Sequence, residues 1–153
     1  MDVRKLGRSM GAEVTGVDLG RLYDATFKGI REAFLAHHVL AIRNQALTPE
    51  AQIAFSRRFG PLEDQLNAHY TVDGYPEVLV LSNDVRDGKP VGLIDGGDFW
   101  HSDSSHRDRP SMATLLYAVR NPEKGGDTEF ANTYAAFEDL PVALVGRALF
   151  LAP

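Results

Sequence analysis

The chain has 153 residues, which is the length of one domain with room for a buried core. Apolar residues make up 44% and charged residues 24% of it, shares that are ordinary for a soluble globular protein. The formal net charge is -5 and no cluster of lysines or arginines is present, which argues against a nucleic-acid-binding protein. Cysteine is absent, which excludes disulfides, thiolate metal sites and cysteine nucleophiles.

The N-terminal residues contain no apolar stretch typical of a signal peptide, and no segment approaches the length of a membrane span. We therefore expect a cytoplasmic protein without a membrane partner.

Helix signals occur at four places in the chain. Asp24 has the character of an N-cap, and apolar residues recur at helical spacing over residues 25–38. Thr48-Pro49-Glu50 combines a cap, a proline at the first helical position and an acidic first turn, and that helix should end near Phe59, before Gly60-Pro61. Thr133 is expected to cap a third helix that reaches Leu140, and Pro141 to open a fourth.

Short segments bounded by turn residues predict strands. They comprise residues 12–17, 39–42, 78–81, 99–104, 114–119 and 128–131. The glycine-rich stretch over residues 84–99 has little apolar content and is expected to be a loop. Strands, turns and a few helices together predict a mainly β core with flanking helices.

The segment Trp100-His101-Ser102-Asp103 carries the most specific chemistry. On an extended strand, His101 and Asp103 project to one side, while Trp100 faces the other side and packs in the core. Their nitrogen and oxygen donors suit a divalent metal and form two thirds of the 2-His-1-carboxylate triad of non-haem Fe(II) oxygenases. Taken alone, a His-x-Asp pair has low specificity, because surface pairs share the pattern.

The other histidines offer no clear third ligand. His106 follows His101 by five residues, which places it on the opposite face of a continuing strand, so we expect a surface or substrate-loop residue. His37 and His38 stand at a helix end, where a cation interacts well with the helix dipole, and are expected to be structural. His69 faces either a pocket or solvent.

Gly125-Gly126 is typical of a tight turn between strands, since glycine adopts positive φ angles. Neither the Walker spacing nor the dinucleotide spacing is present, so this is no phosphate-binding loop. Thr128, just after the turn, could present its hydroxyl to a carboxylate.

The order of several sequence blocks points to one family. The blocks are Gly11–Leu19, His38–Leu40, Arg43–Gln45, Leu47–Glu50, Arg58–Leu62, Trp100–Ser105 and Gly125–Ala131. In this order the chain resembles the TauD/TfdA family of Fe(II)- and 2-oxoglutarate-dependent dioxygenases. The resemblance runs almost from end to end, and residues 104–105 and 128–131 look closer to the phenoxyacetate branch than to the taurine branch.

The resemblance implies a double-stranded β-helix, or jelly-roll, in which His101 and Asp103 are the first two Fe(II) ligands. It implies that the Thr128 hydroxyl helps to hold the distal carboxylate of the cosubstrate 2-oxoglutarate. It places His69 and Tyr70 where such enzymes contact substrate, although that stretch matches loosely. The implied reaction hydroxylates a small, anionic organic substrate with dioxygen.

The chain departs from the family pattern in its length. No residue matches the family's distal histidine ligand or the arginine that pairs with 2-oxoglutarate. Residues 1–153 are therefore expected to be the N-terminal portion of a single dioxygenase domain, with an incomplete jelly-roll. We expect this chain alone to be inactive or nearly so, and robust 2-oxoglutarate-dependent succinate formation by it would contradict that.

Two other functions remain open from the sequence. The chain could be a non-catalytic fragment or subunit that folds by pairing with a complementary chain or with its own copy, since unpaired strand edges invite association. A cupin-like isomerase or metal hydrolase uses a similar barrel but usually has more histidines near the first pair.

Overall fold

The computed structural model describes residues 1–63, 68–94, 96–97 and 99–150. The chain divides into two compact units. Unit 1 is Met1–Gln45 together with the chain from Ala118 onward, and unit 2 is Ala46–Tyr117. Among the described residues, no helix is both long and apolar enough to cross a bilayer.

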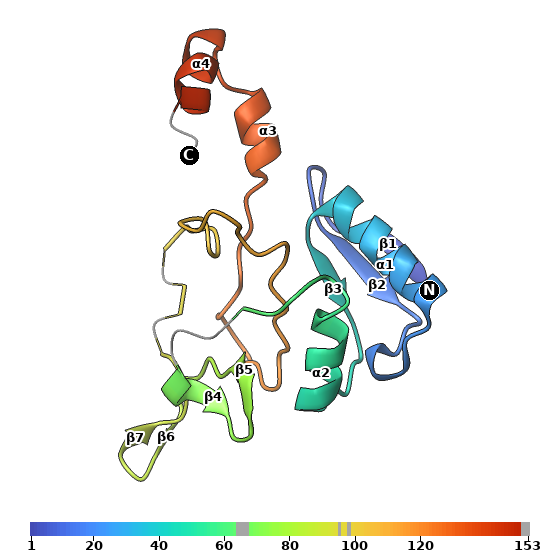
Figure 1. Ribbon diagram of the computed structural model, residues 1–153, viewed down its shortest axis with the longest axis vertical. Helices are drawn as coiled ribbons and strands as arrows, with labels where there is room; N and C mark the ends of the chain where they lie inside the picture. The colour runs from blue at the N-terminus through green and yellow to red at the C-terminus, as the bar shows by residue number, and fades with distance from the viewer. Residues whose placement is uncertain (64–67, 95, 98, 151–153) are drawn as a thin grey trace. The chain divides into compact units, whose positions relative to one another are not determined.

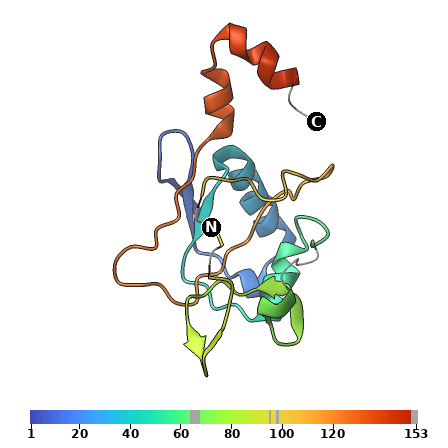
Figure 2. The ribbon, with the colours of Figure 1, turned by 90° about the vertical axis from the view of Figure 1, so that its left-hand side faces the viewer.

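Unit 1 contains a three-stranded sheet and three α-helices (Figure 1). Its elements are β1 (Asp2–Lys5), β2 (Ala12–Thr15), the 3₁₀ helix η1 (Leu19–Arg21), α1 (Asp24–His37), β3 (Leu40–Ile42), α3 (Thr133–Glu138) and α4 (Val142–Phe150). The strand order is β1-β2-β3, with β1 antiparallel and β3 parallel to β2. Helix α1 packs on β2 and β3 (Figure 1 and Figure 2).

The core of unit 1 lies between this helix and the sheet. Alternation along β2 places Ala12 and Val14 in the interior, where both are fully buried. Ile30 and Ala33, three residues apart on α1, supply the facing apolar surface and are also buried. The strand predicted over residues 12–17 and the helix predicted over residues 25–38 are thereby confirmed.

Two helix caps lie one residue earlier than the sequence predicted. The N-cap of α1 is Tyr23, which makes no side-chain cap bond, and Asp24 is instead the first helical residue. The N-cap of α3 is Asn132, whose Oδ1 accepts from the Ala135 N–H at 3.1 Å. A cap residue needs an extended backbone, and Asn132 (φ -83°, ψ 100°) has one whereas Thr133 is already helical.

The described residues of unit 2 form one α-helix, a 3₁₀ helix and two small hairpins. Its elements are α2 (Pro49–Ser56), the 3₁₀ helix η2 (Ala68–Tyr70), β4 (Thr71–Val72), β5 (Tyr75–Leu79), β6 (Val85–Arg86) and β7 (Lys89–Pro90). The predicted start of α2 is confirmed, because the Thr48 hydroxyl accepts from the Ala51 N–H at 3.3 Å. Helix α2 packs on β5 and buries Ile53 and Phe55.

The loop predicted over residues 84–99 contains a hairpin, β6–β7, so that prediction is wrong in part. Asp87 and Gly88 connect the two strands with φ angles of 49° and 76°. An Asp-Gly pair is the sequence signal for such a two-residue turn, because both positions require positive φ.

Three predicted strands have no regular secondary structure. Residues 99–104, 114–119 and 128–131 form no ladder among the described residues, and the chain turns at Asp103. A strand exists only with a hydrogen-bonded neighbour, which local sequence cannot supply. Trp100 is 68% exposed, so its predicted burial is wrong, since the segment has no sheet to place it against a core.

Candidate metal centre

His101 and Asp103 belong to unit 2, and their side chains converge although the backbone is no paired strand. The His101 Nε2 lies 3.3 Å from the Asp103 Oδ1. Two donors bound at right angles to one divalent ion, with bonds of about 2.1 Å, stand about 3.0 Å apart. The side chains are 43% and 51% exposed, so the pair opens to solvent. Their spacing fits neighbouring ligands of one metal.

The contact of the His101 Nδ1 indicates which tautomer the ring adopts. The Nδ1 lies 2.7 Å from the carbonyl oxygen of Phe99, and a carbonyl can only accept, so Nδ1 carries a proton. In a neutral ring, Nε2 then directs its lone pair at a carboxylate oxygen. Nε2 is therefore the ring nitrogen that can donate its lone pair to a metal ion.

Asp103 is held by a second contact. Its Oδ2 accepts a hydrogen bond from the Thr114 hydroxyl at 2.5 Å, which leaves Oδ1 directed at His101. Each candidate ligand therefore has one partner that fixes its orientation: the Phe99 carbonyl for the imidazole and Thr114 for the carboxylate. Such outer contacts are typical of metal ligands.

No third ligand joins the pair within the part of the chain that the structure describes. Among the described residues, no group of three or more His, Asp or Glu side chains is placed to hold a metal. His106 lies near Glu63, and its place as a surface or substrate-loop residue stays a prediction.

Glu63 contacts three residues of the segment that follows Asp103. Its carboxylate accepts from the Ser104 hydroxyl at 2.8 Å and the Ser111 hydroxyl at 2.5 Å, and it lies 3.4 Å from the Arg107 guanidinium. The bonds from Ser111 and Ser104 lower the pKa of Glu63 against the opposing effect of burial, and the charges of Arg107 and His106 add to the lowering. The carboxylate is therefore ionised at neutral pH.

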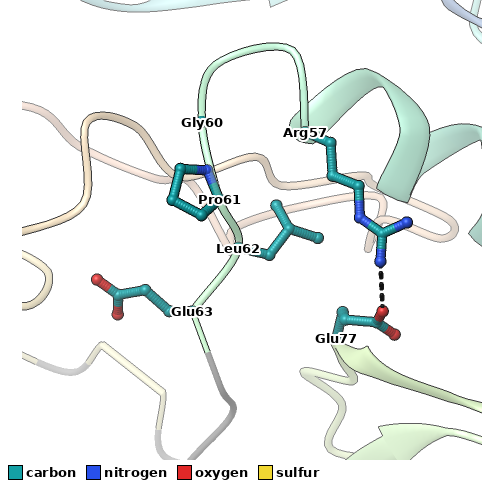
Figure 3. A pocket seen from close by; sticks show the side chains of 6 residues that line it. All are labelled: Arg57, Gly60, Pro61, Leu62, Glu63 and Glu77. Atoms are coloured by element: carbon teal, nitrogen blue, oxygen red, sulfur yellow. Dashed lines mark hydrogen bonds and ion pairs between the residues drawn. The ribbon is translucent and has the colours of Figure 1, made fainter.

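Glu63 also borders an open pocket of about 510 Å³ on unit 2. The pocket is lined by Arg57, Gly60, Pro61, Leu62, Glu63 and Glu77 (Figure 3). Arg57 and Glu77 pair across it at 2.9 Å, and the Glu63 side chain points away from this pair. The pocket contains neither candidate ligand, so we assign it no part of the metal centre.

The remaining predicted site residues come from both units. Thr128 belongs to unit 1 and is exposed in the segment between the glycine turn and α3. His69 is exposed in η2 of unit 2, and Tyr70 is half-buried with its carbonyl accepting from the Val80 N–H. The roles of all three in binding cosubstrate or substrate stay predictions.

The sequence did not indicate Thr114 or Glu63. Thr114 was expected only to begin a strand, and Glu63 stands one residue beyond a recognised block. Thr114 contacts a residue 11 positions away, and Glu63 contacts residues 41 and 48 positions away. No local spacing rule reaches over such separations.

Residues 2–148 match the family described as taurine catabolism dioxygenase TauD, TfdA family. The chain belongs to this family. It is 36% identical over 148 residues to an (S)-phenoxypropionate/alpha-ketoglutarate-dioxygenase of Sphingobium herbicidovorans, covering 95% of this chain and 50% of that protein. It is 37% identical over 142 residues to an alpha-ketoglutarate-dependent 2,4-dichlorophenoxyacetate dioxygenase of Cupriavidus pinatubonensis, covering 85% and 49%.

A solved structure supports the same assignment. A putative alpha-ketoglutarate-dependent taurine dioxygenase from Burkholderia xenovorans superposes with a TM-score of 0.77 and 33% identity, over 95% of this chain and 50% of that one. The predicted fold class, a mainly β jelly-roll with flanking helices, is confirmed by this likeness. The chain spans about half the length of the relatives that it matches.

Proposed function

We propose that this chain contributes two metal ligands to an Fe(II)- and 2-oxoglutarate-dependent dioxygenase that hydroxylates a small, anionic organic substrate. The observation that supports the proposal most directly is the 3.3 Å approach of the His101 Nε2 to the Asp103 Oδ1, with each group's other polar atom occupied. The two curated relatives are named for phenoxypropionate and dichlorophenoxyacetate, both of them carboxylates, which favours an anionic substrate.

His101 and Asp103 would hold the metal through Nε2 and Oδ1. When bound, Fe(II) with 2-oxoglutarate and dioxygen supplies the oxidising chemistry of this enzyme class. The chain's own residues orient the donors: the Phe99 carbonyl keeps the proton on Nδ1, and the Thr114 hydroxyl holds one carboxylate oxygen. The Thr128 hydroxyl would donate to the distal carboxylate of 2-oxoglutarate, and His69 and Tyr70 would contact the substrate.

Titration with Co(II), followed by visible absorption, tests the ligand pair without turnover. We expect His101→Ala and Asp103→Ala each to weaken Co(II) binding at least about 10-fold, since loss of even an outer contact typically costs 10–100-fold. His106→Ala, which removes a nearby imidazole outside the pair, is the matched control and should leave binding unchanged.

The result that would contradict the proposal is an unchanged Co(II) affinity in both His101→Ala and Asp103→Ala. In that case the two side chains form an ordinary surface pair and not a metal site. The cytoplasmic location expected from the N-terminal sequence and from segment hydropathy stays a prediction.

A second candidate function is association with a complementary chain or with a second copy. Large apolar side chains of unit 2 favour it, because Phe99, Trp100 and Leu116 are 73%, 68% and 62% exposed. Native mass spectrometry of the purified chain tests this candidate. A stable, monodisperse monomer would count against any need for a partner.

A further inference from the structure

Glu63 links two segments of unit 2 that are far apart in the sequence. It follows the Gly60-Pro61 stop after α2, while its partners Ser104, Arg107 and Ser111 all come after the candidate metal ligands. One carboxylate thus contacts the eight-residue segment Ser104–Ser111 at its two ends and at Arg107.

The chemistry of this cluster requires an acceptor. Both serine hydroxyls donate to Glu63, one to each of its oxygens, and the Arg107 guanidinium can only donate. A glutamine at position 63 keeps the shape of the side chain but replaces one acceptor oxygen with an amino group. That amino group would face a hydrogen-bond donor and could not accept from it. Glu63 and Arg107 are only 27% and 35% exposed, so the contacts are partly shielded from water.

The contact to Ser104 acts directly beside a candidate ligand. Ser104 follows Asp103 in the chain and has a φ of 54°, and its carbonyl accepts from the Arg107 N–H at 3.0 Å to close a turn. Glu63 holds the side chains of both residues that close this turn. Glu63, which is not part of this turn, therefore fixes the backbone that follows Asp103.

We propose that Glu63 is a positioning residue that fixes the Ser104–Ser111 segment and thereby the placement of the Asp103 carboxylate beside His101. This role rests on the proposed function, because it concerns metal ligands, but the anchoring itself needs no metal. Glu63 contacts neither metal nor substrate in this proposal and acts only through the segment that it holds.

Two measurements on the full chain test the proposal separately. Amide hydrogen exchange of the metal-free protein reports on the anchoring, and Co(II) affinity reports on the ligand placement. We expect Glu63→Ala to speed exchange over residues 103–111 and to weaken Co(II) binding about 10-fold, as is typical when an outer contact of a metal site is lost. Glu63→Gln should give the same changes to a smaller extent.

Two further variants separate this role from a general loss of stability. Glu77→Gln breaks the ion pair with Arg57 on the same unit and should change neither measurement in the Ser104–Ser111 segment. Ser111→Ala removes one donor while Glu63 stays, and should reproduce part of both changes with the remainder of the chain still protected from exchange.

Unchanged exchange in Glu63→Ala would overturn the anchoring. Faster exchange with a wild-type Co(II) affinity and spectrum would show that the segment is held but does not position a ligand, and would also overturn the proposal. A wild-type chain whose Co(II) binding is insensitive to His101 and Asp103 would overturn the proposed function, and the positioning role with it. The exchange result would then still show whether Glu63 anchors the segment.

Discussion

At the scale of single residues, the candidate centre depends on which atom of each side chain is left available. The Phe99 carbonyl accepts a hydrogen bond from the His101 Nδ1, and the Thr114 hydroxyl donates one to the Asp103 Oδ2. Only Nε2 and Oδ1 remain to face each other. The sequence predicted the ligand pair, but its convergence comes from these two contacts and not from strand geometry.

The contact from Thr114 gives a residue-scale prediction. Thr114→Val keeps the shape and removes the hydroxyl, so the Asp103 carboxylate loses the partner that orients it. We expect Co(II) binding to weaken about 10-fold, measured by titration. Thr133→Val, on an exposed position of α3 in the other unit, is the matched control. Equal affinities of Thr114→Val and the wild type would show that the contact does not orient the ligand.

At the scale of elements, the sequence predicted α1, α2 and β2 because their signals are local. Apolar spacing locates the buried face of α1, and Thr48-Pro49-Glu50 locates the start of α2. The cap of α3 was displaced by one residue because Asn132 and Thr133 are both acceptable cap residues. Asn132 also donates to the Ser9 carbonyl at 2.8 Å, a partner 123 residues away, which selects it.

Replacing the two adjacent residues distinguishes the caps. We expect Asn132→Ala to lower the free energy of unfolding by about 1 kcal/mol, since it removes the bond to the Ala135 N–H. Thr133→Ala should change it by less than about 0.5 kcal/mol, as at ordinary surface positions. Urea unfolding measures both free energies. A larger loss of stability in Thr133→Ala than in Asn132→Ala would show that Thr133, the residue that the sequence predicted, is the cap.

At the scale of the whole molecule, each unit contains a carboxylate that joins distant segments through arginine or serine donors. In unit 1, Glu13 on β2 accepts from Arg4 on β1 at 2.9 Å and from Arg43, just after β3, at 3.1 Å. The hydrogen bonds from Arg4 and Arg43 lower the pKa of Glu13 from its ordinary value of 4.5, against the effect of burial. One ionised side chain thus spans all three strands.

This lowered pKa predicts how stability depends on pH. The folded state holds the proton of Glu13 less tightly than the unfolded state, so its contribution is present above pH 4.5 and is lost as pH falls through the lowered pKa. Glu13→Gln should therefore lose less free energy of unfolding between pH 7 and pH 3 than the wild type does. Urea unfolding at both pH values measures this.

Glu32→Gln is the control for this experiment, because it removes a carboxylate that only forms an exposed 4.0 Å pair with Lys28. Its pH dependence should match that of the wild type. If Glu13→Gln loses as much free energy of unfolding between pH 7 and pH 3 as the wild type does, Glu13 is not the source of the pH dependence.

The sequence by itself determined the family and the elements whose signals lie within a few residues of one another, and it predicted His101 and Asp103 as a ligand pair. It did not determine that residues 99–104, 114–119 and 128–131 form no ladder with any other part of the chain that the structure describes, because strand pairing depends on a neighbour that is remote in the chain. The tertiary structure alone identified Thr114 and Glu63. Their importance comes from contacts over 11 to 48 residues, and only folding brings such groups within hydrogen-bonding distance.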